Sequence, residues 1–259
     1  KHFLEKNKSA IQIAGSDPQE IKRTINILNR IDIIKHVNFN LGCPSSRVQE
    51  NMLGLALTQN YDLVKKCLFE LINYKHEVSV KCRLGLGMNE DKNYIFSYLN
   101  LFKDIGIKKV FIHCRNGVLN LDTKKNRTIP QINYELFLEC SKKFPEMELI
   151  PNGEVNDLET FNSFKSKNIN KYMIGRQFAK DALFLEKLKL EKINDKTSLV
   201  LDSIKEYDNY KYLNINLLKK SLFTLINNIS NSKGIKKDIS LIDNTKDLLN
   251  YIERKIIWT

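Results

Sequence analysis

The chain has 259 residues, of which 42% are hydrophobic, enough to bury one large core or one core and a smaller satellite. No apolar run approaches the roughly 18 residues of a membrane-spanning helix, so we expect a cytoplasmic protein without a membrane partner, with an organellar compartment left open. The 42 lysines and arginines exceed the 30 acidic residues by 12. This excess favours a polyanionic partner such as RNA, although a lysine-rich genome produces the same excess.

The five cysteines are odd in number and never stand in C-x-x-C spacing. This pattern argues against both a disulfide framework and a zinc site, so we expect a reducing compartment and no metal.

The first predicted elements are a strand at residues 10–13 and a helix that begins after Asp17. The sequence Asp-Pro-Gln-Glu at residues 17–20 offers an acidic N-cap, a proline in the first turn and a glutamate at the third position. We therefore predict a helix over residues 21–29.

The next run, VNFNLGCPSS at residues 37–46, alternates apolar and polar residues and so predicts a strand. Asn38 and Asn40 share one face of this strand, and two amides on one face need partners. Gly42 permits a turn and Pro44 ends the strand, which places Cys43 on a loop above the sheet. A thiol there is a candidate for chemistry; a buried structural thiol is the alternative.

Further strand-like runs at residues 78–83, 109–115, 148–151 and 171–174 are each followed by a helical pattern. With the two earlier runs they predict six parallel βα units. Polar groups stand at the carboxyl ends of these runs, where parallel barrels carry their active sites. They include Lys81 and Arg83, His113 and Arg115, Asn152-Gly153-Glu154, and Gly175-Arg176. The last two sets favour a phosphate cradle.

The turn-forming residues become scarce after about residue 180. Nine of the ten glycines lie at or before Gly175, and no proline follows Pro151. Beyond that point, residues 199–207, 217–229 and 248–256 carry apolar residues at helical spacing. We therefore predict an α/β domain over residues 1–180 and a small all-helical domain over residues 181–259.

Seven segments occur in the order and approximate spacing of one enzyme family: AIQIAGSDP, VNFNLGCPSSRVQ, VKCRLG, FIHCRNG, KKNRTIP, PNGE and MIGR. The chain resembles the tRNA-dihydrouridine synthases over most of its first domain. It is most similar to the bacterial subgroup that acts on positions twenty and twenty-a of the tRNA D-loop. Two departures from that subgroup are Glu50-Asn51, where Asn-Gly is usual, and Glu154, where glycine is common.

The resemblance implies a TIM barrel that binds FMN, followed by a helical domain that binds tRNA. NADPH would reduce the flavin, hydride would pass to C6 of a flipped-out uracil, and Cys43 would protonate C5, since thiols are mostly protonated at neutral pH. The residues implied to hold FMN are Gln12, Lys81, His113, Asn152, Gly153, Glu154, Gly175 and Arg176.

The resemblance also implies contacts with the substrate. Asn40 would hydrogen-bond the uracil, and the tRNA would meet Arg47, Arg115, Lys125, Asn126, Arg127, Lys236 and Lys237. For the lysines of the helical domain, a solvated face is the alternative.

Two other functions stay open, and each has a discriminating observation. An FMN barrel acting on a free pyrimidine, similar to dihydroorotate dehydrogenase, would not need a basic helical domain. A tRNA-binding protein without catalysis would lack flavin absorbance. We expect a monomer.

A closed TIM barrel has eight parallel strands, whereas we count six βα units here. We therefore expect the barrel in this chain to lack its first two strands, which would precede Gln12. A barrel opened in this way would hold FMN poorly.

Overall fold

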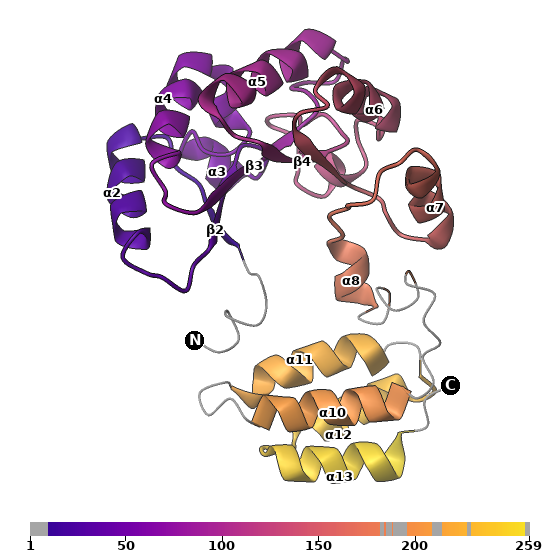
Figure 1. The fold of residues 1–259 in the computed structure, drawn as a ribbon. Coiled ribbons are helices and arrows are strands. Elements are labelled where there is room, and N and C mark those ends of the chain that lie inside the picture. Colours follow the sequence, from indigo (N-terminus) through magenta and orange to yellow (C-terminus); the bar gives the residue numbers. More distant parts are fainter. Residues whose placement is uncertain are drawn as a thin grey trace. The chain divides into compact units, whose positions relative to one another are not determined.

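A computed structural model describes residues 10–181, 184, 188, 196–208, 214–226 and 229–256 (Figure 1). The chain divides into two compact units. They comprise Lys1–Glu154 with Ile169–Met173, and Val155–Asn168 with Ile174–Thr259. The predicted boundary at residue 180 stays a prediction.

The first unit is built on a parallel sheet of five strands whose spatial order follows their order in the chain. The strands are β1 (Ile11–Ile13), β2 (His36–Asn40), β3 (Glu77–Arg83), β4 (Lys109–His113) and β5 (Glu148–Asn152). Sequential parallel strands joined by helices are the arrangement of (β/α) barrels, which confirms the predicted α/β class.

The prediction of a sixth strand at residues 171–174 is wrong. Only Met173 pairs with the sheet, through a single bridge to Asn152, and its N–H donates to the Pro151 carbonyl at 2.9 Å. The run has little room to pair further. Asn168 turns the chain before it with a φ of 61°, and α8 (Arg176–Lys180) begins soon after it.

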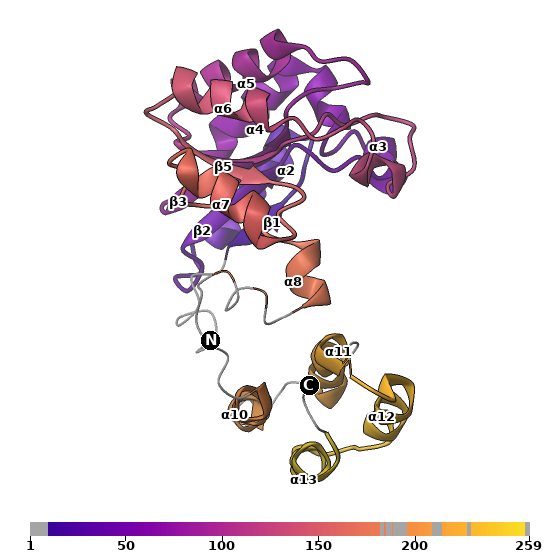
Figure 2. The same ribbon diagram turned by 90° about the vertical axis from the view of Figure 1, so that its right-hand side faces the viewer.

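Four helices cover one side of the sheet (Figures 1 and 2). They are α2 (Pro18–Leu28), α4 (Tyr61–Leu71), α5 (Lys92–Ile105) and α6 (Tyr134–Lys143). The α2 helix begins as predicted, because the Asp17 carboxylate accepts from the backbone N–H of Gln19 at 2.8 Å.

The alternation predicted for β2 is confirmed. Val37, Phe39 and Leu41 are fully buried in the core under the helices. Asn38 and Asn40 lie on the opposite face, where their amides bond other polar side chains. That face carries the functional residues. The short elements after the strands are α3 (Ser46–Glu50), η1 (Ala56–Gln59) and η2 (Lys125–Arg127).

The second unit is helical and has its own core. Its elements are α7 (Leu158–Ser166), α8, α10 (Lys196–Asp208), α11 (Ile215–Ile226), α12 (Ser232–Ser240) and α13 (Thr245–Lys255). Isoleucines and leucines such as Ile204, Leu222 and Ile252 are buried together. The predicted helical stretch 199–207 lies within α10, 217–229 is helical as far as Ile226 with residues 227–228 outside the described part of the chain, and 248–256 is helical as far as Lys255. Within the described residues, no helix is long and apolar enough to cross a membrane.

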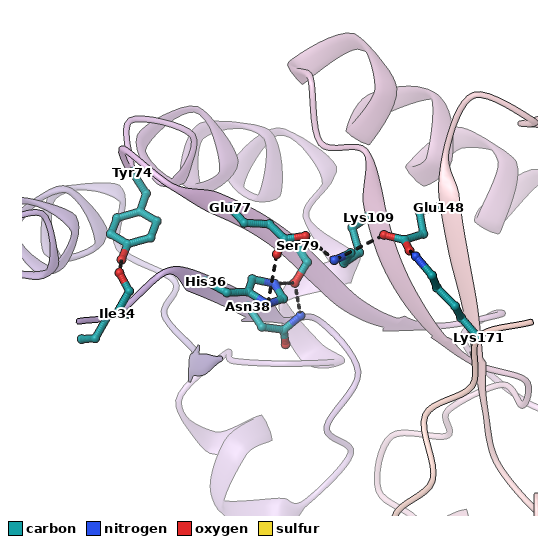
Figure 3. A network of polar contacts seen from close by, with 9 residues as sticks. All are labelled: Ile34, His36, Asn38, Tyr74, Glu77, Ser79, Lys109, Glu148 and Lys171. Carbon is teal, nitrogen blue, oxygen red and sulfur yellow. Dashed lines mark hydrogen bonds and ion pairs between the residues drawn. The ribbon is translucent and has the colours of Figure 1, made fainter. Parts of the chain in front are cut away.

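Alternating charges link the amino ends of three strands (Figure 3). Lys109 of β4 lies between Glu77 of β3 and Glu148 of β5, and pairs with Glu148 at 3.3 Å. Glu148 also pairs with Lys171, while His36 of β2 lies 3.7 Å from Glu77. Because Lys109 faces a carboxylate on each neighbouring strand, this charge belt of Glu77, Lys109 and Glu148 ties β3, β4 and β5 together.

Replacing Lys109 with methionine should lower the free energy of unfolding by about 1–2 kcal/mol, because two carboxylates lose their shared cation. Lys92→Met is the matched control. Lys92 pairs at 2.8 Å with Glu139, both half-exposed, and its loss should cost at most about 1 kcal/mol. Urea denaturation measures both. Equal losses in the two variants would contradict a special role for the charge belt.

Candidate functional site at the carboxyl ends of the strands

Cys43 lies in a tight turn that follows β2, with its side chain half-exposed. The turn is organised by Asn40, the last residue of the strand. Its side-chain oxygen Oδ1 accepts from the N–H of Gly42 at 3.0 Å and from that of Cys43 at 3.1 Å. The Ser45 hydroxyl lies 3.4 Å from the Cys43 sulfur. The predicted loop position of Cys43 is confirmed.

Three successive carbonyls of this turn are each held by a donor from elsewhere in the chain. The donors are Arg83 Nε to Gly42 at 2.9 Å, Leu55 N to Cys43 at 3.1 Å and Gln49 Nε2 to Pro44 at 2.6 Å. Gly54 packs against the same turn with a φ of 57°, and a Cβ there would lie 2.8 Å from the Cys43 oxygen. The turn is therefore held in one conformation.

Arg83 is among the polar residues predicted at strand ends, but the sequence assigns it no role in the site. Its side chain is buried, and its guanidinium also donates to the carbonyls of Asn116 at 2.9 Å and Asn126 at 3.3 Å. Burial, and next the charge of Arg115, lower its pKa to about 10. The strand pattern had placed Arg83 on the face of Lys81, but its carbonyl partners come from loops that are distant in sequence. Arg83 thus joins the Cys43 turn to two loops beyond β4.

Lys81 lies on the same face of β3, opposite Asn40 in the register of the two strands. It is largely buried, and its pKa is lowered, first by burial and then by the charge of Arg83. No carboxylate among the described residues lies within ion-pair distance of its ammonium. A buried cation of this kind suits an anionic or acceptor-rich ligand, as the FMN prediction requires.

The ends of β4 and β5 bring together His113 and Asn152, which are register partners. The His113 ring packs on Gly153, where a Cβ would lie 2.8 Å from its Cδ2 atom. The Asn152 amide donates to the Met173 carbonyl at 2.8 Å. Six of the predicted FMN residues lie in the first unit. His113 and Asn152 end their strands, Gly153 and Glu154 follow β5, and Gln12 and Lys81 lie one and two residues before the ends of β1 and β3.

Two of the residues predicted to contact tRNA are buried. Arg115 is 2% exposed and pairs with Glu154 and with the Pro130 carbonyl. Asn126 is fully buried, and its amide bonds the backbone of Val118 at 2.8 and 2.9 Å. Both side chains are buried and hold loops in place, so we do not propose them as direct tRNA contacts.

The other predicted tRNA residues of the first unit, Arg47, Lys125 and Arg127, are exposed. In the second unit, Gly175, Arg176 and Lys237 are exposed and Lys236 is half-exposed.

A pocket of about 670 Å³ opens beside α3, η1 and the loop after β4. Its polar lining includes Gln49, Glu50 and Asp122. Gln49 bridges the two sides, since it donates to Pro44 and accepts from the N–H of Asn120 at 3.0 Å. Neither Cys43 nor any predicted FMN residue lines this pocket, so the cofactor residues and the pocket are separate features.

A parallel sheet of five strands in sequential order is the arrangement of an α/β protein of the (β/α) type, and the held thiol and the largely buried ammonium mark a candidate ligand site at the carboxyl ends of its strands. The family model for dihydrouridine synthases matches residues 2–251. The chain belongs to the dihydrouridine synthase family.

The curated relatives include several proteins named tRNA-dihydrouridine(20/20a) synthase. That of Pseudomonas aeruginosa is 29% identical over 170 residues, which cover 65% of this chain and 51% of the relative. The protein of Pasteurella multocida is 30% identical over 66% and 52% of the two chains, and that of Yersinia pestis 29% over 76% and 57%. The chain thus spans about half the length of these relatives.

Cys43 should be alkylated well before the other four cysteines, which are all buried. Burial raises the pKa of Cys67 to about 11 and those of Cys82 and Cys140 to about 12, so these thiols hold few thiolates near pH 8. We expect iodoacetamide to modify one thiol per chain at least roughly 100-fold faster than the rest.

Peptide mass spectrometry identifies the modified cysteine, and Cys43→Ser is the control that should abolish the fast phase. Fast modification of a second cysteine in the native chain would contradict the burial described here.

Proposed function

We propose that the protein is a tRNA-dihydrouridine synthase that reduces the C5–C6 bond of a uridine in the tRNA D-loop, at position twenty or twenty-a. The observation that carries this proposal is the Cys43 turn. The turn carries a single accessible thiol, and five backbone groups of the turn are held by hydrogen bonds. Two cations lie near the thiol, the buried Arg83 and the largely buried Lys81. Family membership supports the same reaction.

In this proposal Cys43 is the general acid. Its Sγ proton goes to C5 of the uracil, and the neighbouring Ser45 hydroxyl, at 3.4 Å, offers a path by which the sulfur regains a proton from solvent. Asn40 uses its oxygen to hold the turn and one N–H to reach Gln12, so its second N–H would serve as the donor to the uracil. The uracil must leave the base stack to reach these groups.

We propose that FMN is the cofactor and NADPH the reductant. The residues that would hold FMN are Gln12, Lys81, His113, Asn152, Gly153, Glu154, Gly175 and Arg176. When bound, reduced FMN supplies the hydride that C6 accepts. The Lys81 ammonium would offset negative charge on the bound cofactor, and Gly153, which has no Cβ, lets the His113 ring pack directly on the backbone after β5.

The tRNA would be bound by exposed cations, namely Arg47, Lys125 and Arg127 in the first unit and Lys236 and Lys237 in the second. The net charge of +12 suits this partner. Mapping dihydrouridine in tRNA from cells that lack the gene tests the whole proposal. Loss of the modified base at one D-loop position is expected, and unchanged tRNA would overturn it.

Cys43→Ala should retain FMN and tRNA binding but slow uridine reduction by roughly 10²- to 10⁴-fold, the usual effect of removing a positioned acid. Single-turnover reduction of tRNA by the pre-reduced enzyme measures the step directly. Ser45→Ala is the comparison variant and should have a much smaller effect. Unchanged turnover in Cys43→Ala would remove the thiol from the mechanism.

Replacing Arg127, or the pair Lys236 and Lys237, with alanine should weaken tRNA binding. The slope of log affinity against log salt should fall by about one unit for each lost phosphate contact. Lys142→Ala, an exposed lysine of α6, is the matched control and should leave the slope unchanged. Flavin content should stay the same in all variants. Variants that lose FMN but bind tRNA normally would contradict the assignment of these cations.

A further inference from the structure

A chain of polar side chains crosses the face of the sheet that carries the candidate site, and Figure 3 shows three of its members, His36, Asn38 and Ser79. It joins the Cys43 turn to His36, at the amino end of β2. Its links are Asn40 Nδ2 to Gln12 Oε1 at 3.3 Å, Gln12 Nε2 to Asn38 Oδ1 at 2.7 Å, Asn38 Nδ2 to Ser79 Oγ at 2.7 Å, and Ser79 Oγ with His36 Nε2 at 2.6 Å. We refer to these five residues as the amide chain.

The directions of the three links between amides and to Ser79 follow from the first contact at Asn40. Two backbone N–H groups, those of Gly42 and Cys43, point at one end of the Asn40 amide, so that end must be the oxygen. The Asn40 nitrogen then faces Gln12 and requires an oxygen there. Gln12 in turn presents its nitrogen to Asn38, whose own nitrogen must donate to Ser79.

His36 completes the series as an acceptor. The Ser79 oxygen already accepts from Asn38, so its hydroxyl proton is available for His36 Nε2. This arrangement needs a neutral imidazole with its proton on Nδ1, on the side of Glu77. Burial lowers the pKa of His36, which favours that neutral form. Each donor in the amide chain therefore points from the Cys43 turn toward His36.

We infer that Asn38 and Ser79 are positioning residues, and that the amide chain holds the Cys43 turn and fixes which amide atoms face the ligands. Both side chains are buried beneath the site, at 4% and 0% exposure, so they act through Gln12 and Asn40. Each of these two amide nitrogens uses one N–H in the amide chain and keeps a second for a ligand. These N–H groups and the Lys81 ammonium are all hydrogen-bond donors. The site therefore suits ligands rich in carbonyl oxygens and ring nitrogens, which accept hydrogen bonds.

The identity of these ligands rests on the proposed function, but the positioning role does not require it. Ser79→Val and Ser79→Thr form a matched pair, because valine and threonine have nearly the same shape and only threonine keeps the hydroxyl. In Ser79→Val, Asn38 loses its acceptor and the amides beyond it are free to rotate. Amide hydrogen exchange at Gly42 and Cys43 reports directly on the far end of the amide chain.

We expect exchange at Gly42 and Cys43 to be roughly five- to tenfold faster in Ser79→Val than in Ser79→Thr, the effect of losing about one net hydrogen bond. Exchange in α5 should be equal in the two variants. Ser79→Ala, which adds no volume, is measured in the same way if the valine variant does not fold.

Equal exchange at Gly42 and Cys43 in the two variants, or faster exchange that extends equally through α5, would overturn the inference. The measurement needs no tRNA, reductant or turnover. A protein that fails to reduce uridine but shows the local effect would therefore contradict the proposed function and retain the positioning role.

Discussion

The site depends on one interaction, in which the backbone N–H groups of Gly42 and Cys43 converge on the side-chain oxygen of Asn40. Backbone groups cannot exchange donor for acceptor, so this contact fixes the orientation of an amide that could otherwise turn either way. The same contact shapes the turn that carries the thiol. The backbone geometry at the end of β2 thereby determines the direction of the hydrogen bonds as far as Ser79 on the neighbouring strand β3.

The carbonyls of the turn connect it to the rest of the barrel face. Arg83 of β3 reaches the Gly42 carbonyl and the two loops beyond β4 that contain Asn116 and Asn126. A guanidinium suits this task because its donors spread in a planar fork and it keeps its charge when buried. Arg83 therefore holds the Cys43 turn against the segment that follows β4.

The two ends of the strands use charge differently. At the amino ends, Lys109 lies between Glu77 and Glu148, and opposite charges satisfy one another within the protein. At the carboxyl ends Arg115 pairs with Glu154, but Arg83 bonds only neutral carbonyls among the described residues, and no described carboxylate lies within ion-pair distance of Lys81. Charge that is balanced internally stabilises the fold, whereas cations without acidic partners favour binding of an anion. Barrel enzymes commonly separate stability and chemistry in this way.

Several features followed from the sequence by itself: the two faces of β2, the N-cap of α2, the loop position of Cys43 and the family. Each depends on residues close together in the chain, where period and turn chemistry are decisive. Only the tertiary structure decided that Asn126 and Arg115 are buried, that Arg83 holds three loops, and that residues 171–174 form one bridge. A strand pattern reports the face on which a side chain lies, but not which distant segment covers it. Asn40 and Asn126 are both asparagines, and only their surroundings in the fold show that Asn40 lies in the candidate site whereas Asn126 supports a loop.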